Sequence, residues 1–304
     1  MPDSQLIANV HTGKRVPPWW IALPVAALIL LLASLGGIVG AFFNLARHIG
    51  LANLPHIPPA EIPAQVYPQS AAEQAVWLVT SFIGVYVLLW LWVRLVEKRP
   101  FRTLGFSGDR KAAKYGYGFL VGGGMFALAA GVPWAMGFYR LNAVPPAVFG
   151  SLLVLGGWLV QGSAEELLFR GWLLPVLSAR YGVAVGVPLS AVLFALAHSL
   201  NPHLNVLAIL NLALFGVFAG LYALRDGSIW GVAGIHAAWN WMQGNVLGIP
   251  VSGMMPVGGS WLSLAETGPD WLTGGAFGAE GGLAVSLVLA VGIGLLLKKR
   301  GMSR

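Results

Sequence analysis

The chain has 304 residues, and its composition excludes a water-soluble protein. Apolar residues make up 57% of it and charged residues only 10%, against roughly 25% in a typical soluble domain. At a mean hydropathy of +0.74, the chain has too little polar surface to cover a soluble globule. Disordered and fibrous proteins are excluded too, so the composition predicts an all-α polytopic membrane protein.

The charge and cysteine counts narrow the possible partners and chemistry. The formal net charge is +7, which we interpret as basic loops facing anionic lipid, with the bilayer and no nucleic acid as partner. The chain has no cysteine, which excludes disulfides, thiolate metal ligands and a cysteine nucleophile.

About eight apolar segments are candidates for transmembrane helices, since crossing the hydrocarbon core takes about 20 residues. The first is too long for the core of a signal peptide, so we expect it to be retained. In chain order they cover residues 19–43, 72–93, 115–138, 147–177, 183–198, 204–224, 229–247 and 281–297.

The distribution of Lys and Arg predicts the orientation of these eight spans. With both ends of the chain on one side, that side holds fifteen basic residues, and the other holds only Arg47 and Arg140. This asymmetry predicts cytoplasmic N- and C-termini and a multi-pass protein of the cytoplasmic (plasma) membrane. The fifteen are Lys14, Arg15, Arg94, Lys98, Arg99, Arg102, Arg110, Lys111, Lys114, Arg180, Arg225, Lys298, Lys299, Arg300 and Arg304.

Two adjacent acids, Glu165 and Glu166, lie inside the fourth apolar segment. Carboxylates at membrane depth are costly and usually mark a functional site. Glu166 and Arg170 stand at i,i+4 in the favourable order and predict an ion pair. Glu165 is rotated by about 100° from Glu166, away from Arg170, and is therefore predicted to be functional.

Later apolar segments contribute two histidines. His198 follows Phe194 by four residues, and His236 precedes Asn240 by four, so each pair shares a helix face. Polar side chains on separate spans need partners where water is scarce. We therefore expect these residues and Glu165 to converge on one another or on a wet cavity.

Such a cluster suits peptide-bond hydrolysis. A buried carboxylate with a histidine can activate water, and a second histidine with an asparagine can stabilise an oxyanion. Alternatively, Glu165, His198 and His236 could bind Zn²⁺ and leave a position for water, although the helical H-E-x-x-H motif is absent. A route through Ser163 is weaker, because no G-x-S-x-G frames it.

The ordered motifs resemble the CPBP family. The motifs are Glu165-Glu166-x-x-x-Arg170, Phe194-x-x-x-His198 and His236-x-x-x-Asn240, with no departure from the family pattern. This family, also called ABI, comprises CAAX proteases and bacteriocin-processing proteins and includes the Ras-converting CAAX endopeptidase. The resemblance covers roughly residues 150–245.

The resemblance implies an intramembrane endopeptidase acting on a membrane-associated protein or peptide. It implies that Glu165 activates water with His198 and that His236 and Asn240 form the oxyanion site. Glu166, Arg170 and Phe194 would support them. Family members are named metalloproteases, yet a metal-free glutamate mechanism is argued for the CAAX type, so Zn²⁺ stays open.

We divide the chain accordingly into four parts. Residues 1–18 form a cytoplasmic tail, and 19–146 hold the first spans, a proline-rich outer loop (53–68) and a basic connector (94–114) at the lipid headgroups. Residues 147–249 form the CPBP-like catalytic core. Residues 250–304 hold a glycine-rich outer loop, the last span and a basic tail.

One geometric condition follows from the predicted topology. His236 lies only about seven residues into its span, so it should sit nearer the cytoplasmic face than Glu165 and His198 at 1.5 Å per residue. Convergence of the three therefore requires at least one broken, tilted or shifted segment.

Two other functions fit the same residues. Glu165 and the two histidines could form the relay of a proton-coupled transporter, although the inverted repeats common in transporters are not visible. The chain could also be a non-catalytic, immunity-type membrane protein.

Overall fold

The computed structural model describes residues 3–50, 58 and 62–298 of the chain. In this part nearly all regular structure is helical, as predicted. Residues 53–57 and 59–61 of the proline-rich loop and Lys299, Arg300 and Arg304 of the C-terminal tail lie outside the described residues. The helices are α1 (Gln5–Val10), α2 (Trp19–Ser34), α3 (Gly36–Ile49), α4 (Ile62–Val66), α5 (Ala71–Trp92), α6 (Lys111–Ala135), α7 (Val148–Glu166), α8 (Leu174–Tyr181), α9 (Val183–Ala197), α10 (Val206–Asp226), α11 (Trp230–Trp241), α12 (Asp270–Thr273) and α13 (Leu283–Leu297).

Several shorter elements extend or connect these helices. Two strands of three residues each, β1 and β2, pair antiparallel and are the exception to the all-α prediction. Three π-helical turns follow α5, α7 and α11. The strands are β1 (Tyr139–Leu141) and β2 (Leu264–Glu266), the π-helical turns are Val93–Glu97, Leu167–Leu173 and Met242–Val246, and the 3₁₀ turns are Phe101–Leu104, Gly275–Phe277 and Ala279–Gly281.

All eight predicted apolar segments are helical, but they differ in length. Five helical stretches in the described chain are long and apolar enough to cross a membrane, which makes this a multi-pass integral membrane protein. The helices α9 and α13 have 15 residues each, or about 22 Å, short of a full hydrocarbon core. The five are Trp19–Ile49, Ala71–Glu97, Lys111–Ala135, Val148–Tyr181 and Val206–Asp226.

The segment predicted at 229–247 is a buried central helix. Every residue of α11 from Gly231 to Trp241 is buried, and α11 packs between α6 and α7. Glycines on α6 permit this contact: a Cβ at Gly118 would lie 1.9 Å from the Gly231 carbonyl oxygen, and one at Gly122 would lie 2.3 Å from that of Ile235. Close backbone approach through small residues is a common way to pack membrane helices.

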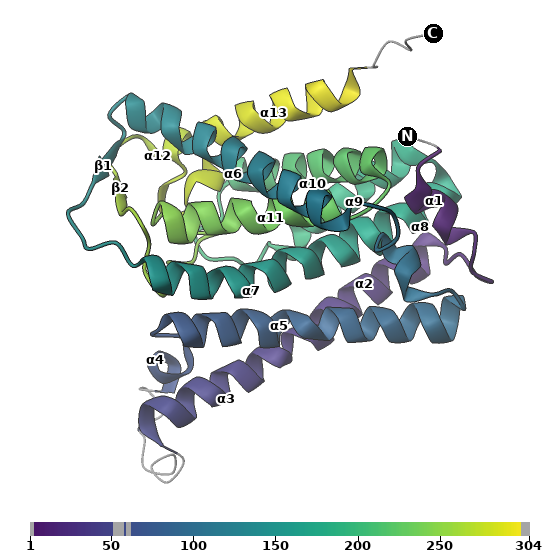
Figure 1. Ribbon diagram of the computed structural model, residues 1–304, viewed down its shortest axis with the longest axis horizontal. Helices are drawn as coiled ribbons and strands as arrows, with labels where there is room; N and C mark the ends of the chain where they lie inside the picture. The colour runs from purple at the N-terminus through teal and green to yellow at the C-terminus, as the bar shows by residue number, and fades with distance from the viewer. Residues whose placement is uncertain (1–2, 51–57, 59–61, 299–304) are drawn as a thin grey trace.

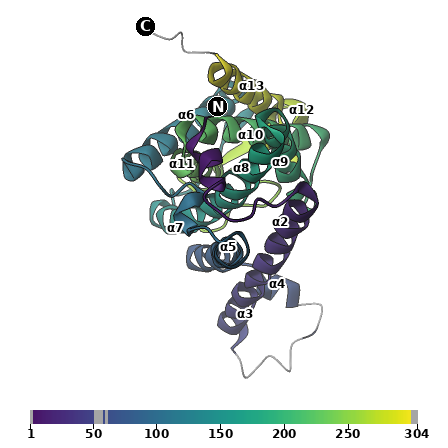
Figure 2. The ribbon, with the colours of Figure 1, turned by 90° about the vertical axis from the view of Figure 1, so that its right-hand side faces the viewer.

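The helices run lengthwise beside one another, with α1 and the last residues of α13 at the same end (Figure 1). The sheet and α12 lie at the opposite end, next to the start of α7. The helix α3 forms one edge of the molecule, with α5 between it and α7 (Figure 2). The long helices therefore give the protein two distinct ends.

Part of the basic connector is not at the surface. Arg99 is fully buried and its Nε lies 2.6 Å from Glu97 Oε2. The other carboxylate oxygen of Glu97 accepts hydrogen bonds from the indoles of Trp92 (2.7 Å) and Trp172 (2.5 Å). The part of the predicted connector (94–114) that holds Glu97 and Arg99 therefore folds into the protein interior.

Candidate active site

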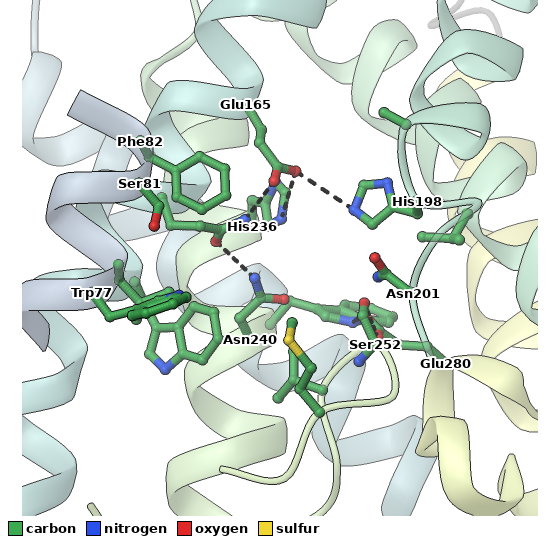
Figure 3. A pocket seen from close by; sticks show the side chains of 18 of the residues that line it. Trp77, Ser81, Phe82, Glu165, His198, Asn201, His236, Asn240, Ser252 and Glu280 are labelled. Carbon is green, nitrogen blue, oxygen red and sulfur yellow. Dashed lines mark hydrogen bonds and ion pairs between the residues drawn. The ribbon is translucent and has the colours of Figure 1, made fainter. Parts of the chain in front are cut away.

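Three helices bring the predicted site residues together. Glu165 lies one residue before the end of α7, His198 follows the last residue of α9, and α11 carries His236 and Asn240. Figure 3 shows the four side chains around one cavity. Glu165, His236 and Asn240 are buried, at 5–7% exposure.

The Glu165 carboxylate faces both imidazole rings. Its Oε2 lies 3.8 Å from Nε2 of His198 and 3.8 Å from Nε2 of His236. These separations exceed a direct hydrogen bond and match a polar contact bridged by one water molecule. Oε2 makes no hydrogen bond to a described protein group, so it is the oxygen of Glu165 available for chemistry.

Hydrogen bonds on the opposite nitrogens orient both imidazoles. Nδ1 of His198 lies 2.8 Å from the carbonyl oxygen of Phe194, and Nδ1 of His236 lies 2.8 Å from Glu166 Oε1. A carbonyl and a carboxylate accept protons, so we assign a proton to each Nδ1. Nε2 of each ring is thereby directed at Glu165.

The predicted ion pair between Glu166 and Arg170 is present. Arg170 Nη1 lies 2.9 Å from Glu166 Oε1, and both side chains are buried. The guanidinium lies 4.4 Å from the ring centroid of Phe194 and within 6 Å of those of Phe169 and Phe215. Since the same Glu166 oxygen accepts from His236, the pair also fixes a residue of the cavity.

The helices that carry Glu165 and His198 are interrupted or end close to these residues. The α-helical hydrogen bonding of α7 gives way to a π-helical turn at Leu167, directly after Glu166. The short helix α9 ends at Ala197, so that His198 lies at its C-terminus. π-helical turns often occur at functional sites, where they reposition side chains on a helix.

Gln161 belongs to the same cluster, although the sequence did not identify it. Its Nε2 donates to Glu165 Oε1 (2.8 Å), and its Oε1 accepts from Asn240 Nδ2 (2.9 Å). The available signal was a polar residue in an apolar run four residues before Glu165, a spacing that places both on one helix face. Gln161 thereby links the carboxylate of α7 to the amide of α11.

The cavity around these residues has a volume of about 700 Å³. Its walls are mostly apolar and aromatic, with contributions from α5, α10 and the loop at 251–257. A second buried acid, Glu280, lines it and accepts from the Trp239 indole (3.1 Å) and the Ser252 amide and hydroxyl (2.9 and 2.8 Å). Glu280 thus ties the loop to α11 beside Asn240.

The zinc alternative gains no support from the arrangement of side chains. Across residues 3–50, 58 and 62–298, no group of three or more His, Cys, Asp or Glu side chains is placed to hold a metal ion.

Comparison with known proteins supports a peptidase relationship. Residues 146–242 match the family model of the type II CAAX prenyl endopeptidase Rce1-like proteins. The chain is 33% identical over 171 residues to the uncharacterised protein YyaK of Bacillus subtilis (strain 168), a match covering 50% of this chain and 54% of YyaK. The chain thus matches about half the length of this relative. No solved structure matches significantly.

The four predicted catalytic residues and Gln161 all fall within the matched region. Residues 146–242 of this chain therefore form a domain of the Rce1-like type II CAAX prenyl endopeptidase (CPBP) family.

Proposed function

We propose that this protein is an intramembrane endopeptidase that hydrolyses a peptide bond of a membrane-associated protein or peptide, with residues 147–249 as its catalytic core. The observation that carries the proposal is the Glu165 Oε2 atom, equidistant from two histidine Nε2 atoms within a cavity. The family match supports the same class of reaction. We also propose that it resides in the cytoplasmic membrane with both chain ends in the cytoplasm.

In the proposed mechanism, Glu165 is the general base. A water molecule between Oε2 and His198 Nε2 gives a proton to the carboxylate while its oxygen attacks the substrate carbonyl carbon. His198 orients this water and is itself held through the Phe194 carbonyl. The proton on Glu165 then passes to the leaving amine nitrogen as the carbon–nitrogen bond breaks.

His236 and Asn240 stabilise the negative charge on the carbonyl oxygen of the tetrahedral intermediate. His236 donates through Nε2 when both ring nitrogens are protonated, while Nδ1 donates to the Glu166 carboxylate. One amide hydrogen of Asn240 is used by Gln161, and the second is available for the oxyanion. Fixed donors of this kind are a major source of rate enhancement in acyl transfer.

Gln161 acts as a positioning residue in this scheme. By donating to Oε1 of Glu165, it leaves Oε2 as the oxygen that faces the histidines. By accepting from Asn240, it orients the oxyanion donor. One side chain thereby positions both the proposed base, Glu165, and the proposed oxyanion donor, Asn240.

The test is Glu165→Gln, which removes the base while preserving the shape of the side chain. We expect membrane-derived cleavage products seen by mass spectrometry in cells with the wild-type protein to vanish in cells with the variant. Glu266→Gln, the same change outside the site, should retain them. Unchanged products in Glu165→Gln cells would remove the proposed base.

Two further outcomes would favour the alternative functions. Proton-coupled flux in proteoliposomes without any proteolysis would favour a transporter. Full biological activity after changing both His198 and His236 to Ala would favour a non-catalytic protein.

A further inference from the structure

The two ends of the helical bundle differ in charge. At one end, three hydrogen bonds connect segments that are distant in sequence. Arg225 donates to the Lys298 carbonyl, Arg180 donates to the Val16 carbonyl, and the Lys14 amide donates to the Glu97 carbonyl. We call this the basic end. Its described basic residues are Lys14, Arg15, Arg94, Lys98, Arg99, Arg102, Arg110, Lys111, Lys114, Arg180, Arg225 and Lys298.

The opposite end, here called the loop end, carries α4, the β1–β2 sheet and α12 (Figure 1). Arg47 and Arg140 are its basic residues in the described part of the chain. Acidic residues at this end include Glu266 and Asp270. The contrast in basic charge therefore runs along the long axis of the molecule.

The cavity extends from Glu165 to the loop end. Its lining includes Tyr67 and Pro68, just before α5, and Met254 and Met255 in the loop after α11. Tyr67 is 61% exposed and Met255 70% exposed, so these side chains form a rim open to the surroundings. No lysine or arginine of the described residues lines the cavity.

Toward the basic end, the cavity floor is closed. Every residue from Ala164 to Ser178 is buried, including the π-helical turn directly after Glu166. Beyond the turn, Trp172 donates to the fully buried Glu97, which pairs with Arg99. This packing closes the side of Glu165 that faces the basic end. Other parts of the cavity lining come from the loop end and from α2, α3 and α5, including the exposed Ser34.

Basic loops of multi-pass proteins face the cytoplasm. We propose that the basic end is cytoplasmic and that the cavity is loaded from the non-cytoplasmic face, so that the substrate is a polypeptide segment presented outside the cytoplasm. That the cavity receives a substrate rests on the proposed function, whereas the side of the membrane to which the cavity opens does not. The apolar rim of Tyr67, Met254 and Met255 suits a segment with apolar side chains, and methionine adapts well to varied partners.

The absence of cysteine makes a direct test possible, since any introduced thiol is unique. Three single-cysteine variants report three places: Met255→Cys at the rim, Ser81→Cys in the cavity wall (Figure 3), and Asp109→Cys, exposed at the basic end. Each is treated with a membrane-impermeant maleimide in spheroplasts and again after permeabilisation.

We expect Met255→Cys and Ser81→Cys to be labelled in intact spheroplasts and Asp109→Cys only after permeabilisation. Labelling of Asp109→Cys in intact spheroplasts, with Met255→Cys protected, would overturn the proposal. So would protection of Ser81→Cys while Met255→Cys reacts, because the cavity would then be closed to that face.

The same labelling in a Glu165→Gln background separates the two proposals. If labelling is the same in the Glu165→Gln background and the parent protein shows no cleavage activity, the proposed sidedness stands and the proposed peptidase function is wrong. If the parent protein cleaves substrate but Asp109→Cys is labelled in intact spheroplasts and Met255→Cys is protected, the peptidase function stands and the proposed sidedness is wrong. Reduced cleavage by active Ser81→Cys protein after labelling from the non-cytoplasmic face would connect the cavity entrance to turnover.

Discussion

The described residues include two buried glutamate–arginine pairs, and these pairs have different surroundings. Both oxygens of Glu97 are occupied, one by two indoles and the other by Arg99, and neither Glu97 nor Arg99 lines the main cavity. Glu166 binds Arg170 and also His236, whose ring does line the cavity. The first pair joins two segments of chain, residues 92–99 and the π-helical turn that carries Trp172. The second pair contacts His236, whose ring lies beside Glu165.

The difference shows that burial and charge pairing do not by themselves mark a functional site. A buried ion pair can be replaced by apolar packing with little loss of stability, so its presence is weak evidence of any role. Glu166 differs from Glu97 because it also binds His236, whose ring faces the cavity. The variants below test whether the two pairs act as differently as their contacts indicate.

The largest effect is expected for Glu166→Gln. Gln keeps the size of the side chain but removes the carboxylate that accepts from His236 Nδ1 and orients its ring. We expect kcat to fall by about three orders of magnitude, as when the acid that orients a catalytic histidine is lost. Steady-state kinetics on purified protein measures this fall, with thermal unfolding as the check on folding. A variant with normal kcat would assign Glu166 a structural role only.

Both variants should be less stable, because Glu166→Gln leaves Arg170 and Glu97→Gln leaves Arg99 buried without a counter-charge, but only Glu166→Gln should lower kcat. Breaking a buried pair in this way destabilises by about 3 kcal/mol. For Glu97→Gln we expect a lower unfolding midpoint, with kcat of the folded fraction unchanged. A fall in kcat at temperatures where the variant remains folded would show that Glu97 also serves the site.

A smaller effect is expected at Gln161. Gln161→Met keeps the length of the side chain and removes both hydrogen bonds, and a hydrogen bond to a charged group contributes about 1.5 kcal/mol, or roughly tenfold in rate. We expect kcat to fall with KM unchanged. Gln161→Glu keeps an acceptor for Asn240 but places a second carboxylate beside Glu165, so it should be less active than Gln161→Met. Equal activity of the two would deny Gln161 a role at Glu165.

The smallest effect concerns Glu266, a partly buried acid at the loop end without a basic partner among its described contacts. Burial raises the pKa of this carboxyl, the Gly275 amide opposes the shift, and Asp270 adds to it. A raised folded-state pKa means that its contribution to stability is present at low pH and is lost as pH rises through that value. As pH rises across the acidic range, the loss of stability due to Glu266 should be absent in Glu266→Gln, so its unfolding midpoint should fall less than that of the parent protein. An identical pH dependence of the two midpoints would contradict this.

The sequence predicted those parts of the site that depend on local spacing. The Glu166–Arg170 pair follows from four-residue spacing on a helix, and the apolar segments follow from local hydropathy. The same local rules did not predict the burial of Arg99, which the sequence placed in the basic connector at residues 94–114. Its partner Glu97 is only two residues away in a π-helical turn, and the indole of Trp172 comes from a distant helix.

The sequence by itself determined a helical membrane protein, a resemblance to the CPBP motifs and a short set of polar residues that needed partners. The tertiary structure decided which partners they found: Glu166 with His236, Gln161 with Glu165 and Asn240, and α11 buried in the centre. Hydropathy and helical periodicity are properties of neighbouring residues. The contacts that hold His236 and Asn240 join residues 70 and 79 positions apart in the chain, so they arise only when the helices pack.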